Sequence, residues 1–144
     1  GAPYWDPEAR GSIVGLTRDS GVPEIVRAAL ESVAYQTRDL FEAMAADGTT
    51  PASVRVDGGM AANDWTMQFL ADVLSVSVER PLNTETAVLG AAYLAALGAG
   101  ICGSLDDVAE NWKIDKTFAP TMADTERERL YTGWLRAVEQ TRRS

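Results

Sequence analysis

Two adjacent glycines and a nearby asparagine form the pattern in this sequence with the clearest chemical potential. Gly58 and Gly59 follow the short apolar run 53–56 and precede Asn63, where a helical pattern begins. Glycines after a strand let the backbone turn sharply, and they let a ligand approach without meeting a Cβ atom. The free N–H groups at the start of the next helix suit a phosphate. The same residues also suit a tight turn with Asn63 as a helix cap, and the pattern alone favours that simpler interpretation.

Five acidic residues lie at this turn or follow it along the chain: Asp57, Asp64, Asp72, Glu79 and Glu85. A pair of carboxylates can transfer protons or hold Mg²⁺. The spacing of these five is not that of metal ligands, and the charged faces of a soluble domain explain them better. We therefore expect no catalytic residue and no metal-binding residue in this chain.

A third feature is the segment 89–96, which is composed mainly of Ala and Gly with two leucines and a tyrosine. Small residues let a helix approach its neighbour closely, so we expect this helix to pack tightly against a sheet or another helix. The same composition suits a sliding contact at the junction of two moving domains. The sequence does not distinguish the two, although close packing is the commoner case.

The hydrophobic periodicity places these features on alternating strands and helices. The longest predicted helix spans 23–46, with Val26, Leu30 and Val33 in its apolar stripe, Pro23 in its first turn and Gly48 after its end. Residues 103–123 are mixed, with Trp112 and Phe118 as expected anchors. The other predicted elements are strands at 12–17, 53–56 and 76–79 and helices at 63–74, 86–97 and 124–141. Alternation of this kind predicts an α/β domain with a parallel βαβα core and a carboxyl-terminal helix.

Composition limits the function further. The 144 residues suffice for one domain, and the net charge of −8 argues against nucleic acid as a partner. The chain has no histidine, which excludes a Ser-His-Asp triad or a histidine-bound zinc within it. The single Cys102 fits a reducing cytoplasm, and no segment predicts a membrane span. Because the chain begins with Gly1 and has no leader-like run, we expect a piece of a longer cytoplasmic protein.

Several segments resemble the FGGY family of carbohydrate kinases in the same order along the chain. The second signature of the family is matched by 11–16, Gly-Ser-Ile-Val-Gly-Leu, followed after seven residues by 24–31, Glu-Ile-Val-Arg-Ala-Ala-Leu-Glu. Residues 1–7, 15–18 and 31–39 resemble the glycerol kinase branch of the family. The likeness continues through 55–63, 86–95 and 126–134, so it covers nearly the whole chain.

The resemblance implies an ATPase domain of the actin and hexokinase type, built on a ribonuclease-H-like sheet. Residues 1–144 are then the carboxyl-terminal part of the second kinase domain. Members of this branch use ATP and Mg²⁺ to convert glycerol to sn-glycerol 3-phosphate. By position, Gly58, Gly59 and Met60 match the nucleotide loop, with backbone atoms along the adenosine and α-phosphate side. Asn63 is expected to add a side-chain hydrogen bond, whereas Asp64 replaces a second Asn of many relatives and is not expected to touch phosphate.

The match leaves out the parts of the family that perform the chemistry. The amino-terminal phosphate loop, the catalytic aspartate and the residues that hold glycerol and Mg²⁺ have no counterpart in these 144 residues. We therefore expect the isolated chain to be inactive, since phosphoryl transfer needs positioning and charge stabilisation. Two alternatives remain open: another FGGY kinase acting on a pentulose, and a non-catalytic module that dimerises or binds a partner. A homo-oligomer is expected because a separated domain exposes apolar surface.

Overall fold

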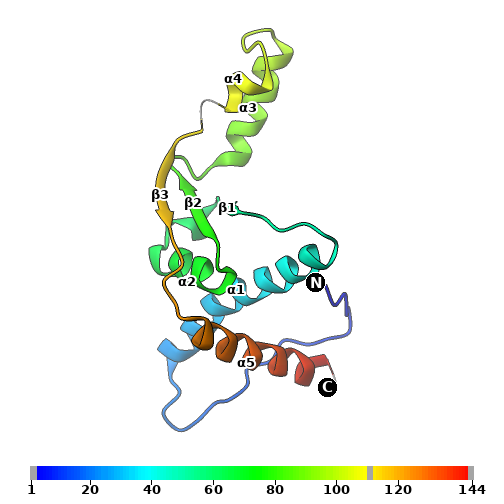
Figure 1. The fold of residues 1–144 in the computed structure, drawn as a ribbon, viewed down its shortest axis with the longest axis vertical. Helices are drawn as coiled ribbons and strands as arrows, with labels where there is room; N and C mark the ends of the chain where they lie inside the picture. Colours follow the sequence, from blue (N-terminus) through cyan, green and yellow to red (C-terminus); the bar gives the residue numbers. More distant parts are fainter. Residues whose placement is uncertain (1–2, 110–111, 143–144) are drawn as a thin grey trace.

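Five helices and three strands make up the computed structural model, which describes residues 3–109 and 112–142 (Figure 1). The strands are β1 (Ser53–Arg55), β2 (Ser77–Pro81) and β3 (Ile114–Phe118). The helices are α1 (Val22–Ala46), α2 (Asp64–Leu74), α3 (Thr86–Gly98), α4 (Leu105–Ala109) and α5 (Asp124–Arg142), with a 3-10 turn at Gly59–Ala62. The structure thus confirms the predicted helices 23–46, 63–74, 86–97 and 124–141 to within one residue at each end.

The three strands form one sheet in the order β1-β2-β3. β1 runs parallel to β2, with Val54 opposite Val78, and α2 connects them, as the βαβ pattern predicts. β3 was not predicted; it pairs antiparallel to β2, with Phe118 opposite Val78. The predicted parallel core is therefore correct for β1 and β2, and β3 makes the sheet mixed.

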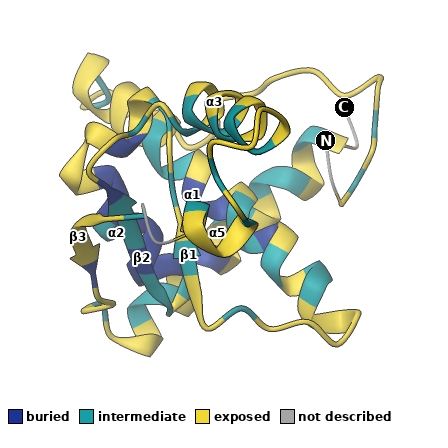
Figure 2. Cartoon of the chain, turned by 90° about the horizontal axis from the view of Figure 1, so that it is seen from above, coloured by how far each residue is buried: buried dark blue, intermediate teal, exposed yellow. Residues whose placement is uncertain are grey.

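The core lies where α1, α2 and α5 meet the sheet. In Figure 2 the buried residues gather around α1, α2 and β2. The buried hydrophobic side chains include Ala34, Tyr35, Phe69, Leu70, Val73, Val78, Phe118 and Tyr131. Phe118 is thus the core anchor that was expected, whereas Trp112 is only half-buried beneath the guanidinium of Arg55, 4.7 Å from the ring centroid.

The ends of α1 follow from local hydrogen bonding. The N–H of Gly21 donates to Glu24 over 2.8 Å, and Pro23 lies in the first turn. At the other end Gly48 adopts a φ of 84° and its N–H donates to the carbonyl of Ala45 over 3.0 Å. A left-handed glycine in this position ends a helix without Cβ strain. Because residues at both ends of α1 favour the start and the end of a helix, its bounds could be predicted from the sequence.

Three expectations were wrong in whole or in part. Residues 12–17 form no strand; Gly15 has a φ of 79°, which interrupts an extended backbone, and Ile13 and Leu16 are each 59% exposed. The predicted stripe of α1 is only partly correct, since Leu30 is half-buried but Val26 and Val33 are exposed, and the buried residues include Ala34 and Tyr35.

The third error concerns the small-residue helix. α3 contains no buried residue, and Val88 and Leu94 are 68% and 67% exposed. Figure 1 shows α3 and α4 projecting from the end of the molecule opposite α5. The expected close packing of this helix is therefore absent among the described residues: one side, which includes Leu89, Tyr93 and Leu97, is half-buried, and the rest is exposed.

Candidate functional site

The loop that follows β1 has a conformation that requires glycine. Gly58 adopts a φ of 80° and a ψ of 174°, a combination that side chains with a Cβ rarely tolerate. Its N–H donates to the carbonyl of Thr84 over 2.8 Å. Since Thr84 follows β2, this bond joins the loops at the carboxyl ends of the two parallel strands. Ligands of open α/β sheets commonly bind at this edge.

The residues after Gly58 lead directly into α2. Gly59–Ala62 form a single 3-10 turn, and Asn63 precedes the first residue of the helix. The side-chain oxygen of Asn63 accepts the N–H of Thr66 over 3.1 Å, so Asn63 caps α2. The prediction that Asn63 caps a helix is confirmed, and its side-chain oxygen is occupied by the N–H of Thr66.

The backbone at Gly59 and Met60 is open. Among the described residues, no acceptor takes the N–H of either residue. Gly59 is exposed, and a Cβ placed on it would meet nothing within 4 Å. Met60 is 46% exposed. The structure therefore brings Gly58, Gly59, Met60 and Asn63 into one accessible turn, with two unused donors at the start of the 3-10 turn that precedes α2.

Asp57 and Thr86 form a second link across the same edge of the sheet. The hydroxyl of Thr86, the first residue of α3, donates to the Asp57 carboxylate in a short hydrogen bond. Asp57 is therefore held by the start of α3 rather than left as a free surface charge. Together with the bond from Gly58 to Thr84, this contact fixes the strand-to-turn connection from two sides.

Asp64 is neutralised by two basic residues of the sheet. Arg80 donates to one carboxylate oxygen over 2.7 Å, and Lys116 donates to the other over 2.6 Å. The hydrogen bond from Lys116, and next that from Arg80, lowers the pKa of the Asp64 carboxyl. Arg80 also donates to the carbonyl of Ala61 over 3.0 Å, so it braces the 3-10 turn. Asp64 thus serves to hold this turn, and its charge is balanced.

A cavity of about 320 Å³ opens near this edge. Thr86 contributes to its wall, but Gly58, Gly59, Met60 and Asn63 do not. Its other polar and aromatic wall residues include Arg55, Asn83, Tyr93, Trp112 and Lys113. The predicted nucleotide loop therefore lies on open surface beside a cavity and does not line it.

Neither a metal centre nor a membrane span emerges from the part of the chain that the structure describes. Within residues 3–109 and 112–142, no three Asp, Glu or Cys side chains are grouped so that they could hold a metal ion. Over the same residues, no helix has the length and apolar character needed to cross a bilayer.

Sequence reasoning missed the residues that support the turn. Thr84, Thr86 and Arg80 hold it through Gly58, Asp57 and the 3-10 turn, respectively. One signal could have found two of them: the run Thr84-Glu85-Thr86 follows β2 just as Asp57-Gly58-Gly59 follows β1. In a parallel pair, residues after neighbouring strands meet at one edge.

Comparison with known proteins gives a consistent result. Residues 1–99 match the carboxyl-terminal domain of the FGGY family of carbohydrate kinases. The chain is 59% identical over 142 residues to glycerol kinase 1 of Pseudomonas aeruginosa, covering 99% of this chain and 29% of that protein. It is 60% identical over 143 residues to the glycerol kinase of Ectopseudomonas mendocina, with the same coverage of each. The chain thus spans less than a third of the length of these relatives.

Solved structures agree with the sequence relatives. The Plasmodium falciparum glycerol kinase with ADP superimposes with a TM-score of 0.83 at 37% identity, over 97% of this chain and 28% of that one. The xylulose kinase of Rhodospirillum rubrum does so with a TM-score of 0.78 at 28% identity, over 94% of this chain and 28% of that one. With the family match over residues 1–99, these similarities show that the chain belongs to the FGGY family of carbohydrate kinases.

Proposed function

We propose that residues 1–144 are the carboxyl-terminal part of the second domain of an ATP-dependent glycerol kinase and form one wall of its nucleotide site. The observation that carries the proposal is the open turn at Gly59 and Met60, whose unused N–H groups precede α2. Identity of 59–60% to two glycerol kinases supports glycerol as the substrate of the complete protein. A solved xylulose kinase is only 28% identical, so a pentulose is the less favoured substrate.

In this proposal each residue of the turn has a separate role. Gly58 sets the direction of the chain, because its backbone conformation strains any residue that has a Cβ atom. Gly59 and Met60 present N–H groups to the adenosine and α-phosphate side of ATP, and Gly59 leaves room for the nucleotide to approach. Asn63 caps α2 through its oxygen and offers its side-chain N–H₂ to the ligand. The nucleotide supplies the phosphoryl group that is transferred to glycerol.

The catalytic steps fall to the rest of the kinase. We place the contacts to glycerol, to Mg²⁺ and to the transferred phosphoryl group in the amino-terminal part of the complete protein. Transfer requires those groups to be positioned and their charge stabilised, and a single wall of the nucleotide site does neither. The isolated chain is therefore inactive. The cytoplasm, where ATP is made and used, is the compartment that fits this role.

The test uses the complete kinase that contains this chain. Gly59→Val places a branched side chain where the nucleotide approaches, so we expect the KM for ATP to rise about tenfold or more while the KM for glycerol changes little. Gly133→Val is the matched control, since Gly133 is an exposed position of α5 at which a Cβ would meet nothing within 4 Å. An unchanged KM for ATP in Gly59→Val contradicts the assigned site. Faster turnover of xylulose than of glycerol contradicts the substrate.

We also propose that the isolated chain associates with a second copy of itself. Large apolar side chains on α1 and α3 are exposed, including Val22 at 72%, Val88 at 68% and Leu94 at 67%. Exposed apolar side chains on these two helices favour association with another copy. Sedimentation at increasing concentration measures this directly, and a Val88→Glu, Leu94→Glu double variant is expected to remain monomeric. A chain that stays monomeric at every concentration contradicts this part of the proposal.

A further inference from the structure

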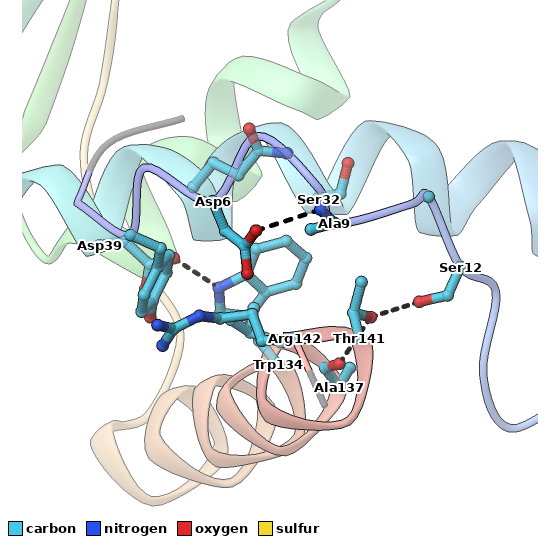
Figure 3. Close-up of a pocket in the computed structure, with 13 residues that line it drawn as sticks. Asp6, Ala9, Ser12, Ser32, Asp39, Trp134, Ala137, Thr141 and Arg142 are labelled. Carbon is cyan, nitrogen blue, oxygen red and sulfur yellow. Dashed lines mark hydrogen bonds between the residues drawn. The ribbon is translucent and has the colours of Figure 1, made fainter. Parts of the chain in front are cut away.

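A second cavity lies between the amino-terminal segment, α1 and α5 (Figure 3). Its volume is about 360 Å³, which is within the range of small-molecule sites. It shares no wall residue with the turn at 58–63. The side chains that give its wall chemical character are Tyr4, Asp6, Gln36, Asp39, Trp134 and Arg142.

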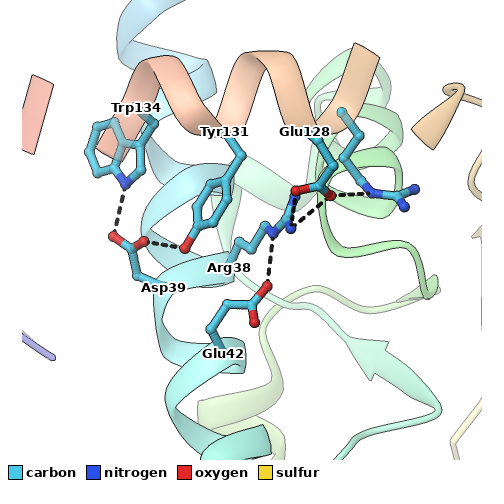
Figure 4. Close-up of polar contacts among 7 residues, drawn as sticks. Arg38, Asp39, Glu42, Glu128, Tyr131 and Trp134 are labelled. Carbon is cyan, nitrogen blue, oxygen red and sulfur yellow. Dashed lines mark hydrogen bonds and ion pairs between the residues drawn. The ribbon is translucent and has the colours of Figure 1, made fainter. Parts of the chain in front are cut away.

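Asp39 places a buried carboxylate in the wall of this cavity. The residue is only 4% exposed. One oxygen accepts the hydroxyl of Tyr131 over 2.6 Å, and the other accepts the indole N–H of Trp134 over 2.8 Å (Figure 4). Both donors are neutral, and among the described residues no ion pair includes Asp39. A carboxylate removed from water is costly unless a cation balances it.

The nearby arginine of α1 is engaged elsewhere. Arg38 pairs with Glu42 over 3.1 Å and with Glu128 over 2.9 Å, and its guanidinium lies 4.0 Å from the centroid of the Tyr131 ring. Arg142 does line the cavity, but its guanidinium lies over the ring of Tyr4, 5.0 Å from the centroid. Neither arginine forms an ion pair with Asp39 among the described residues, so its carboxylate has no directly paired cation.

The rest of the wall suits an organic cation. The ring of Trp134 lines the cavity, and aromatic rings attract cations when water is excluded, whereas the Tyr4 ring already faces the guanidinium of Arg142. Asp6 adds a second carboxylate, of which one oxygen accepts the N–H groups of Glu8 and Ala9. The Gln36 amide has no partner among the described residues, so it is available to a ligand. The two carboxylates of the wall disfavour the binding of an anion, and the aromatic part of the wall disfavours the binding of a strongly hydrated metal ion.

We propose that this cavity is a binding site for a small organic cation that carries a primary ammonium group, held by the charge of Asp39 and the ring of Trp134. The site is separate from the nucleotide turn, and it forms between the first and last segments of the chain (Figure 3).

The probe is n-butylammonium chloride, titrated into the 144-residue chain at constant ionic strength. The reporter is the indole N–H resonance of Trp134, because that N–H donates to Asp39. We expect a saturable shift with a dissociation constant in the range of about 1 mM, which corresponds to roughly one charge-assisted contact in a small pocket. The neutral analogue 1-butanol at the same concentrations is expected to leave the resonance unchanged. An equal shift with 1-butanol overturns the proposal.

Substitutions separate the charge of Asp39 from its structural role. Asp39→Asn is expected to weaken n-butylammonium binding about tenfold or more. Arg142→Met is expected to strengthen it, because a like charge leaves the cavity wall. Asp19→Asn, at an exposed loop position, is the matched control and is expected to bind as the parent does.

If Asp39→Asn does not fold, Ser32→Leu provides the test. Ser32 lines the cavity from α1, and its hydroxyl donates only to the carbonyl of Ala29 over 2.8 Å. A leucine there fills part of the space without touching the bonds of Asp39, so binding is expected to fall below detection. Undiminished binding in Ser32→Leu, or in a folded Asp39→Asn, overturns the proposal.

Discussion

The N–H of Gly58 donates to the carbonyl of Thr84 over 2.8 Å. This one bond joins the loop after β1 to the loop after β2, and it does so at the carboxyl ends of two parallel strands. The positive φ of Gly58 turns the chain so that Gly59 and Met60 lie exposed ahead of α2. The hydrogen bond between the two loops and the conformation of Gly58 therefore fix the turn, and they leave its two N–H groups without an acceptor among the described residues.

The first prediction compares the two glycines of the turn. Gly58→Ala is expected to lower the free energy of unfolding by about 1–3 kcal/mol, because a Cβ strains the backbone at a φ of 80°. Gly59→Ala is expected to change it by less than about 0.5 kcal/mol, since its Cβ would meet nothing within 4 Å. Urea denaturation of the 144-residue chain measures both. Equal effects at the two positions would show that Gly58 is not under a special constraint.

The second prediction concerns the contact between α1 and α5. Tyr131→Phe removes the hydroxyl that donates to the buried Asp39 over 2.6 Å, and it is expected to cost about 1.5–3 kcal/mol of stability. Tyr93→Phe is the matched control, because among the described residues the Tyr93 hydroxyl has no hydrogen-bond partner. Thermal and urea unfolding report the difference. If both variants are equally stable, the Asp39 contact does not hold the two helices together.

The third prediction concerns Asp72, which was expected to lie on a charged surface. The residue is 7% exposed, and its carboxylate accepts the N–H groups of Thr121 and Met122 over 2.6 and 3.1 Å, just before α5. Asp72→Ala leaves these donors without partners and is expected to cost about 2 kcal/mol or more. Asp19→Ala, at an exposed position, is expected to be close to neutral. Hydrogen exchange adds a local test, since the Thr121 amide should lose its protection only in Asp72→Ala.

The fourth prediction is a dependence on pH. The hydrogen bonds from Lys116 and Arg80 lower the pKa of Asp64 in the folded chain. Their contribution to stability is therefore complete above the ordinary aspartate pKa, and it is lost as the pH falls through the lowered pKa. A carboxyl ¹³C titration is expected to show a lowered midpoint for Asp64 that rises in Lys116→Met. Lys113→Met is the control, and an identical rise in it would mean that general surface charge sets the pKa.

Local signals in the sequence were sufficient for much of the fold. Pro23 and Gly48 mark the ends of α1, and the structure places them at those ends. The strand at 12–17 was wrong because an apolar run becomes a strand only with a partner, and Gly15 bends the chain there. β3 was missed because the charged residues Asp115 and Lys116 interrupt the apolar pattern that predicts a strand. Asp115 pairs with Arg80 and Lys116 pairs with Asp64, and both partners are far away in the sequence.

Long-range contacts account for the missed parts of the site and the core. Thr84 and Thr86 matter because of Gly58 and Asp57, more than 20 residues earlier. Asp39 is buried through Tyr131, which lies 92 residues later. No local sequence pattern predicts such a distant partner, because a single charged residue by itself is predicted to be exposed. The glycines of the turn predicted only a change in chain direction, and the interpretation of 58–63 as a nucleotide loop came from the resemblance to the FGGY family.

The most direct measurement is an ADP titration of the isolated chain followed by backbone amide shifts. A single wall encloses little of the ligand, so binding near or above about 1 mM is expected. The shifts are expected to be confined to residues 57–64, to vanish in Gly59→Val and to persist in Gly133→Val. Shifts elsewhere in the chain, or binding that survives Gly59→Val, would show that the nucleotide does not use this turn.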